Sequence, residues 1–192
     1  MRARIVLLAA VLAAVASSAP ARAEVQKFVT ICGRNEQGVR LCPSFALMLT
    51  PPEGWVEDAA ASKQNGVQML VPKGRNFNSA DAAIYVKVSY RSDKNRPVAD
   101  FARVSQERWR KAVPDTTIAA LPEQPRDSGK PAFLLFRYEN PSRPQQAHEI
   151  AAFGLDSDKD GNDYVLTVVI TGSAKKFLER ADEPYKAFLR AH

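Results

Sequence analysis

The clearest pattern that could carry chemistry is an acidic run, Asp156-Ser157-Asp158-Lys159-Asp160-Gly161. Its opening has the Asp-x-Asp-x-Asp-Gly spacing of a calcium loop, in which alternating carboxylates surround one cation. Asp156, Asp158 and Asp160 are therefore candidate calcium ligands. The bidentate Glu that closes such a loop is replaced by Thr167, and the run lies between two expected strands. These departures favour an ordinary polar turn, in which Asp, Asn and Gly accept the backbone angles.

Few other residues offer catalytic groups. His148 and His192 are the only histidines, and the sequence has no Gly-x-Ser-x-Gly elbow and no Gly-rich phosphate loop. Since Glu149 follows His148 in an expected strand, these two side chains should point to opposite faces. No catalytic residue is assigned. A carboxylate pair such as Glu139 and Asp163 could still meet in space, which keeps a carboxylate-based hydrolase as an alternative.

A second group of residues is basic. Arg103, Arg108, Arg110 and Lys111 lie together on the polar face of an expected helix. Such a group is either a solvated helix face or a patch for an anionic surface, such as a membrane or a wall polymer. The overall charge is too small to indicate a nucleic-acid partner.

The two cysteines, Cys32 and Cys42, flank the turn-forming run 35–38. A hairpin centred on Gln37 would place them opposite each other on adjacent strands. An even number of cysteines in an oxidising compartment favours a disulfide bond. A redox or metal-binding pair would more typically have Cys-x-x-Cys spacing, which is absent.

The N-terminus predicts export. Arg2 and Arg4 precede an apolar run over residues 5–16, and Ala21-Arg22-Ala23 has the small-x-small pattern of a cleavage site. Residues 1–23 are therefore expected to be a signal peptide, and residues 24–192 a single periplasmic or secreted domain. Without the three arginines of the leader, 24 basic and 21 acidic residues leave a charge of +3. No later apolar run is long enough to span a membrane.

Hydrophobic periodicity predicts an α+β fold. After the hairpin, period-2 runs indicate strands, and period-3.6 stripes indicate a helix after Pro97 and another after Gly172-Ser173, with Ser173 as N-cap and Pro184 kinking or dividing it. Short turns between consecutive strands indicate mainly antiparallel pairing, and each amphipathic helix needs a sheet to cover. We therefore expect a twisted antiparallel sheet flanked by helices. The expected strands cover residues 45–49, 66–71, 82–90, 116–121, 132–138, 148–155 and 164–171.

Three features resemble the PsbP-like and DcrB-like group of α/β/α sandwiches. They are the strand closed by Pro52-Glu53-Gly54-Trp55, the strand from Asn65-Gly66-Val67 to Val71-Pro72-Lys73-Gly74, and the late hairpin followed by a helix with Phe177 and Tyr185. The resemblance implies the same sandwich and an accessory or binding role outside the cytoplasm. It carries no functional residue over, and the cysteine hairpin is an addition to its pattern.

The sequence thus predicts an exported, non-catalytic accessory or binding protein of the bacterial envelope, acting on another protein or on the envelope surface. The alternatives are a carboxylate-based hydrolase and a carrier of a small ligand or metal ion. No cofactor is expected apart from the calcium alternative. A deep apolar pocket with converging polar groups would favour a ligand binder or an enzyme, whereas a filled core with a broad exposed patch would favour protein or surface binding.

Overall fold

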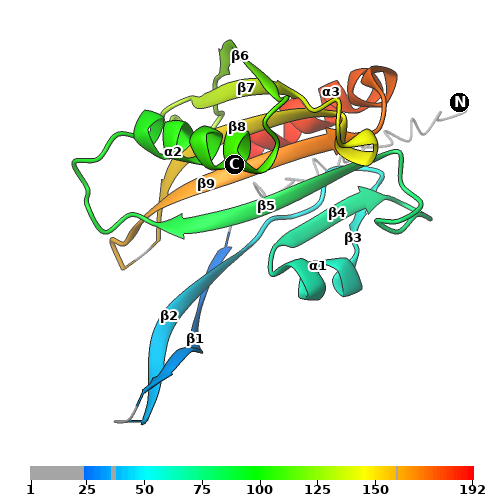
Figure 1. Cartoon of the computed structure of the whole chain (residues 1–192). Helices are drawn as coiled ribbons and strands as arrows, with labels where there is room; N and C mark the ends of the chain where they lie inside the picture. Colours follow the sequence, from blue (N-terminus) through cyan, green and yellow to red (C-terminus); the bar gives the residue numbers. More distant parts are fainter. Residues whose placement is uncertain (1–23, 36–37, 159) are drawn as a thin grey trace, which may run out of the picture.

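A computed structural model of the chain describes residues 24–35, 38–158 and 160–192 (Figure 1). It confirms the predicted α+β class. A seven-stranded sheet has the order β3-β4-β5-β9-β8-β7-β6, and all neighbours are antiparallel. Its strands are β3 (Trp55–Glu57), β4 (Gln68–Pro72), β5 (Ala82–Tyr90), β6 (Thr117–Gln124), β7 (Phe133–Glu139), β8 (His148–Ser157) and β9 (Asp163–Gly172). The helices are α1 (Ala59–Asn65), α2 (Val98–Ala112) and α3 (Lys175–Ala191), with a 3-10 turn η1 (Pro144–Gln146).

None of these helices is long and apolar enough to cross a membrane. The expected signal peptide lies outside the described residues.

The predicted N-terminal hairpin is present as a separate two-stranded sheet, β1 (Glu24–Asn35) and β2 (Gly38–Met48), which extends away from the main sheet in Figure 1. Its register corrects one expectation. Cys42 pairs with Thr30, not with Cys32, because the turn already pairs Asn35 with Gly38 and a bulge follows Ile31. The side chains of both cysteines lie outside the described residues, so the disulfide bond remains a prediction.

Two helices cover one face of the main sheet. The helix expected after Pro97 is confirmed as α2, and its buried Ala102 packs on the sheet together with half-buried Val98 and Trp109. The shorter α1 covers β4 on the same face, through Ala61. The sequence prediction missed α1, although Asp58 caps its first turn by accepting from the Ala61 amide at 3.1 Å.

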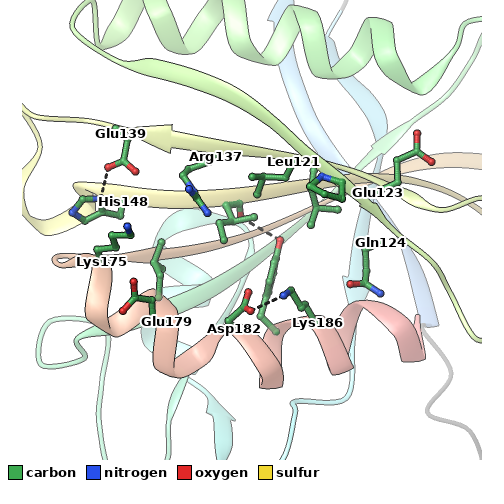
Figure 2. A pocket seen from close by; sticks show the side chains of 15 residues that line it. Leu121, Glu123, Gln124, Arg137, Glu139, His148, Lys175, Glu179, Asp182 and Lys186 are labelled. Atoms are coloured by element: carbon green, nitrogen blue, oxygen red, sulfur yellow. Dashed lines mark hydrogen bonds and ion pairs between the residues drawn. The ribbon is translucent and has the colours of Figure 1, made fainter.

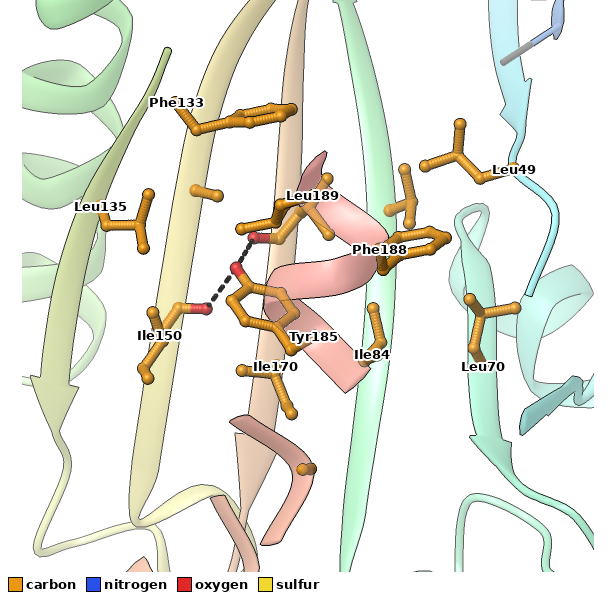
Figure 3. Close-up of a cluster of buried hydrophobic side chains, with 14 of the residues drawn as sticks. Leu49, Leu70, Ile84, Phe133, Leu135, Ile150, Ile170, Tyr185, Phe188 and Leu189 are labelled. Atoms are coloured by element: carbon orange, nitrogen blue, oxygen red, sulfur yellow. Dashed lines mark hydrogen bonds between the residues drawn. The ribbon is translucent and has the colours of Figure 1, made fainter. Parts of the chain in front are cut away.

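One long helix, α3, covers the other face. Figure 3 shows Tyr185 at the centre of this core, where its hydroxyl donates to the carbonyls of Val168 (2.8 Å) and Ile150 (3.2 Å). Two details of α3 differ from expectation. Ala174, not Ser173, occupies the N-cap position and makes no side-chain cap bond, and Pro184 lies inside the helix without dividing it. The core that anchors α3 is fully buried, so it can offset the missing hydrogen bond of Pro184.

Candidate functional site

The two faces of the sheet differ in how completely they are covered. Seven strands about 4.8 Å apart make a sheet about 29 Å wide, whereas one helix is about 10 Å wide. The single helix α3 packs on the central strands and leaves part of β6 and β7 uncovered. A groove therefore forms between α3 and the β6 edge of the sheet.

This groove has a volume of about 500 Å³. Its apolar floor comes from the sheet, through Leu121, Leu135 and Ile150, and from α3, through Leu178 and Tyr185. Its rim is polar, and Figure 2 shows rim side chains projecting from both the strands and the helix. The rim consists of Glu123, Gln124, Arg137, Glu139, His148, Lys175, Glu179, Asp182 and Lys186.

The register of the strands explains how the rim is assembled. Glu139 on β7 pairs directly with His148 on β8, so the His148 Nδ1 and the Glu139 carboxylate meet and form an ion pair when the ring is charged. On α3, Asp182 and Lys186 are four residues apart and pair at 2.6 Å. These two pairs hold their charges to each other.

The remaining rim charges are not neutralised in this way. Four charged rim residues make no ion pair with other described residues, and they are Arg137, Lys175, Glu123 and Glu179. The rim therefore presents two free cations and two free carboxylates around an apolar floor. Such an arrangement suits a ligand that has an apolar anchor and charges of both signs.

The groove offers no free hydroxyl or thiol nucleophile. No Ser, Thr or Cys is among its lining residues. The Tyr185 hydroxyl is committed to two backbone carbonyls, and burial holds its pKa well above the usual value. The His148–Glu139 pair resembles a general base that a carboxylate orients.

No protein-family model matches the chain, and no curated protein matches its sequence.

The carboxylate pair suggested from sequence, Glu139 and Asp163, does not form. Glu139 pairs with His148 at one end of β8, and Asp163 pairs with Ser157 at the other end. Nine residue steps of about 3.3 Å separate these ends by about 30 Å. Asp163 instead lies near Arg91, at 3.6 Å. This version of carboxylate catalysis was therefore wrong, because the antiparallel register could not be seen from the sequence.

The acidic run forms a turn, and its carboxylates point to different partners. Asp156 is buried and contacts Arg126 at 3.5 Å and also Lys130. Asp158 accepts from the Tyr164 hydroxyl, from the side chain and the backbone of Asn162, and from the backbone of Asp160. These hydrogen bonds, that of Tyr164 above all, lower the pKa of Asp158 to about 2.

Asp156, Asp158 and Asp160 are thus not assembled around one cation. Within the part of the chain that the structure describes, no three His, Cys, Asp or Glu residues are grouped to hold a metal ion. The geometry matches the polar-turn interpretation of this run, in which side-chain oxygens satisfy the turn's own amides.

The four basic residues of the suggested anionic-surface patch lie on α2. Arg103 is engaged by Glu107 at 2.9 Å and Asp100 at 3.6 Å, so it is not available as a free charge. The other three residues are exposed and make no ion pair with described residues, and they are Arg108, Arg110 and Lys111. The patch is therefore smaller than the sequence suggested.

Sequence reasoning missed the groove and most of its residues. Its lining comes from four separate elements, namely β6, β7, β8 and α3. The sequence did hold one signal for the surroundings of His148. The period-2 pattern placed His148 and Glu149 on opposite faces, and the structure confirms this, since they line different cavities.

Proposed function

We propose that this chain is an exported, non-catalytic accessory protein that binds an extended segment of a partner protein in the α3 groove. One observation carries the proposal. A groove of about 500 Å³ has an apolar floor bordered by unpaired charges of both signs, and no Ser, Thr or Cys lines it. Binding through an apolar anchor with charged flanks is what such a surface can do best.

The distribution of charge favours a peptide over a simple amphiphile. A fatty acid or similar molecule has one charged end and would be matched by a rim of one sign. Here Arg137 and Lys175 are cations, whereas Glu123 and Glu179 are anions, and they lie along the groove on both walls. A segment with side chains of both signs around an apolar residue complements this pattern. The groove also opens beside β6, the edge strand, which leaves it accessible from the side.

Export and the disulfide bond belong to the same proposal. The leader at residues 1–23 supports a periplasmic or secreted location, and an oxidising compartment supports a bond between Cys32 and Cys42. The resemblance to the PsbP-like and DcrB-like group supports an accessory role. N-terminal sequencing of the native protein should begin at Glu24. Because the two cysteines are expected to be joined, the intact mass of the protein should rise only after reduction. A native N-terminus at Met1 with two free thiols would contradict both.

The binding site can be tested by selecting peptides from a random library on the mature protein. Leu121→Trp places a bulky ring on the floor, and Ala120→Trp is its matched control. Ala120 is exposed and next in the chain, on the opposite face of the same strand. We expect selected peptides to share an apolar residue with charged neighbours and to bind in the micromolar range, with Leu121→Trp weakening them at least about tenfold.

Ala120→Trp should leave the affinity within about twofold, since it does not reach the groove. Circular dichroism of both variants checks that they are folded. If no selected peptide distinguishes Leu121→Trp from Ala120→Trp, the groove is not the binding site. A photoreactive amino acid at Glu123 then extends the test to the native compartment, where cross-links should form from Glu123 and not from Ala120.

A hydrolase remains the second candidate, because the groove contains the His148–Glu139 pair. A histidine oriented by a carboxylate can activate water as a general base. If the chain is such an enzyme, His148→Asn should abolish turnover of an ester or phosphoester substrate while leaving the fold intact. Absence of any turnover by the wild-type protein would leave the binding role.

A further inference from the structure

A second cavity lies on the opposite face of the sheet, beneath α2, and it is distinct from the α3 groove. It has a volume of about 140 Å³ and is roofed by Ser105 and Trp109 of α2. The neighbouring strands β5, β7, β8 and β9 supply its floor and walls. These strand residues are Tyr85, Lys87, Tyr138, Glu149, Ala151, Phe153, Thr167 and Val169.

The register shows why a cavity exists at this place. Across the sheet, Tyr85 pairs with Val169, which pairs with Ala151. The small side chain of Ala151 leaves space between the larger residues on either side. Glu149 lies one row away toward one end, and Lys87 lies one row away toward the other, so the two rows are about 13 Å apart along the strands. The cavity is therefore elongated, with a carboxylate and an ammonium at opposite ends.

Glu149 is the unusual group in this cavity, because only 3% of it is exposed and the side chains that donate hydrogen bonds to it are neutral. The Tyr85 hydroxyl donates to Oε1 at 3.4 Å, and the Asn140 amide donates to Oε2 at 3.2 Å. No Lys, Arg or His among the described residues lies within 4.0 Å of this carboxylate. A buried carboxylate without a counter-ion is costly, and folded proteins generally pair such a charge.

A network of hydrogen bonds holds the carboxylate in place. Asn140 is fully buried, and its Oδ1 accepts from the Trp109 indole at 3.0 Å and from the Thr116 hydroxyl at 2.6 Å. Its amide donates to the Gln146 carbonyl at 2.9 Å as well as to Glu149. This network fixes Glu149 and Trp109 relative to each other before any ligand arrives.

Aromatic rings surround the remaining space. Tyr85, Trp109, Tyr138 and Phe153 all line the cavity, and the face of each ring carries partial negative charge. Trp109 already attracts one cation, since the Arg143 guanidinium lies 5.3 Å from its ring centroid. Rings and a single carboxylate do not supply the several hard oxygen ligands that calcium or magnesium requires.

We propose that the cavity beneath α2 binds a small organic ammonium ion, with Glu149 as its counter-ion and the rings of Tyr85, Trp109 and Tyr138 as its walls. The volume limits the bound group to about the size of a trimethylammonium head. Neutral molecules would leave Glu149 uncompensated, and anions would be repelled by it. This inference does not depend on the function proposed for the α3 groove.

Other charged groups near the cavity change its affinity for a cation. Lys87 lines the far end, and Arg143 and Arg110 lie near enough to influence Glu149 and Tyr138, respectively. All three are cations and should weaken binding of another cation.

Burial raises the pKa of Glu149 to about 7, although the hydrogen bond from Asn140 opposes this shift. Burial and the Glu149 charge raise the pKa values of Tyr85 and Tyr138, so both phenols stay neutral. A cation should therefore bind better at pH 8 than at pH 6.

The test uses choline and its neutral isostere 3,3-dimethyl-1-butanol, which differ in the charged nitrogen. Binding to the mature protein is measured by calorimetry and by tryptophan fluorescence, in phosphate buffer because amine buffers would compete. We expect choline to bind at least about tenfold more tightly than the alcohol. Its affinity should rise roughly tenfold from pH 6 to pH 8, as Glu149 becomes ionised.

Glu149→Gln keeps the shape and removes the charge, so it should abolish the preference for choline. Glu139→Gln is the matched control, because it removes a carboxylate from the α3 groove and should leave choline binding within about twofold. Ser105→Phe is the second variant, in case Glu149→Gln fails to fold. It fills the cavity from the helix and should abolish choline binding. Equal affinity for choline and the alcohol, or unchanged choline binding in Glu149→Gln or Ser105→Phe, would overturn the proposal.

Discussion

The two faces of the sheet show two ways of using the same strands. The core beneath α3 is apolar, and Tyr185, Phe188 and Leu189 in it are at most 3% exposed. The α2 face has half-buried apolar contacts and a polar network around Asn140 and Glu149. The first face supplies most of the burial that stabilises the fold, whereas the second holds a charge that the fold alone does not neutralise. A region that is poorly optimised for stability is where a ligand can contribute.

The sharpest contrast should come from removing one large side chain on each face. Tyr185→Ala creates a cavity in the α3 core and should lower the free energy of unfolding by about 4 kcal/mol. Val98→Ala on α2 removes a half-buried side chain and should cost about 1 kcal/mol. Urea unfolding measures both. Tyr185→Phe, which loses the hydroxyl but fills the space, is the control and should cost about 1 kcal/mol. Similar losses for Tyr185→Ala and Val98→Ala would show that the faces contribute equally.

The pH dependence of stability should identify the charge on the α2 face. The pKa of Glu149 is raised from 4.5 to about 7 in the folded state. A raised carboxyl pKa stabilises the fold below the unfolded value, and this contribution is lost as pH rises through the folded value. Relative to Glu149→Gln, the wild type should therefore lose about 3 kcal/mol between about pH 4 and about pH 8.

The test compares the stability of the wild type with that of Glu149→Gln at each pH, because a second group also titrates in both proteins. Burial lowers the pKa of His192 to about 4, which makes the fold lose stability as pH falls below about 6.5 in both proteins. His192 therefore cancels in the comparison. If the wild type and Glu149→Gln have parallel stability profiles, Glu149 does not titrate as the structure indicates. Glu139→Gln serves as the control on the α3 side.

The two faces should also differ in how well they tolerate added side-chain volume, although this effect is smaller. Gly154 lies on the α3 face, where an added Cβ would come within 2.4 Å of the Phe133 ring. Phe133 is fully buried and is stacked by the Arg126 guanidinium at 4.6 Å, so it has little freedom to move. Gly154→Ala should cost about 2 kcal/mol in thermal or urea unfolding. Ser105→Ala, on the cavity side of α2, is the comparison and should change stability by less than about 0.5 kcal/mol.

The smallest expected effect concerns the outer surface of α2. Reversing Arg108, Arg110 and Lys111 to Glu should weaken binding to anionic vesicles at low salt by at least about tenfold, without changing stability appreciably. Vesicle sedimentation at rising salt measures it, and any binding should fade as the charges are screened. Binding by the wild type that is absent, or that does not respond to salt, would remove the surface-patch hypothesis.

Local pattern was enough for most elements of the fold. The alternation at residues 82–90 predicted β5, and the helical stripe after Pro97 predicted α2, because these signals arise from neighbours in the chain. Helix ends were less predictable. The Ser173 cap was wrong because the packing of α3 on the core decides where its first turn begins, and α1 was missed because it is only seven residues long.

The sequence by itself determined the class of fold, the hairpin near the N-terminus and the opposite orientation of His148 and Glu149, since all three follow from short-range periodicity. The tertiary structure alone decided which residues meet. Register paired Glu139 with His148 and separated it from Asp163, and it set Asn140, Tyr85 and Trp109 around one carboxylate. Such contacts depend on strand register and on helix packing, and no local propensity encodes them. The same packing of helices on the sheet leaves a groove on one face and a cavity on the other.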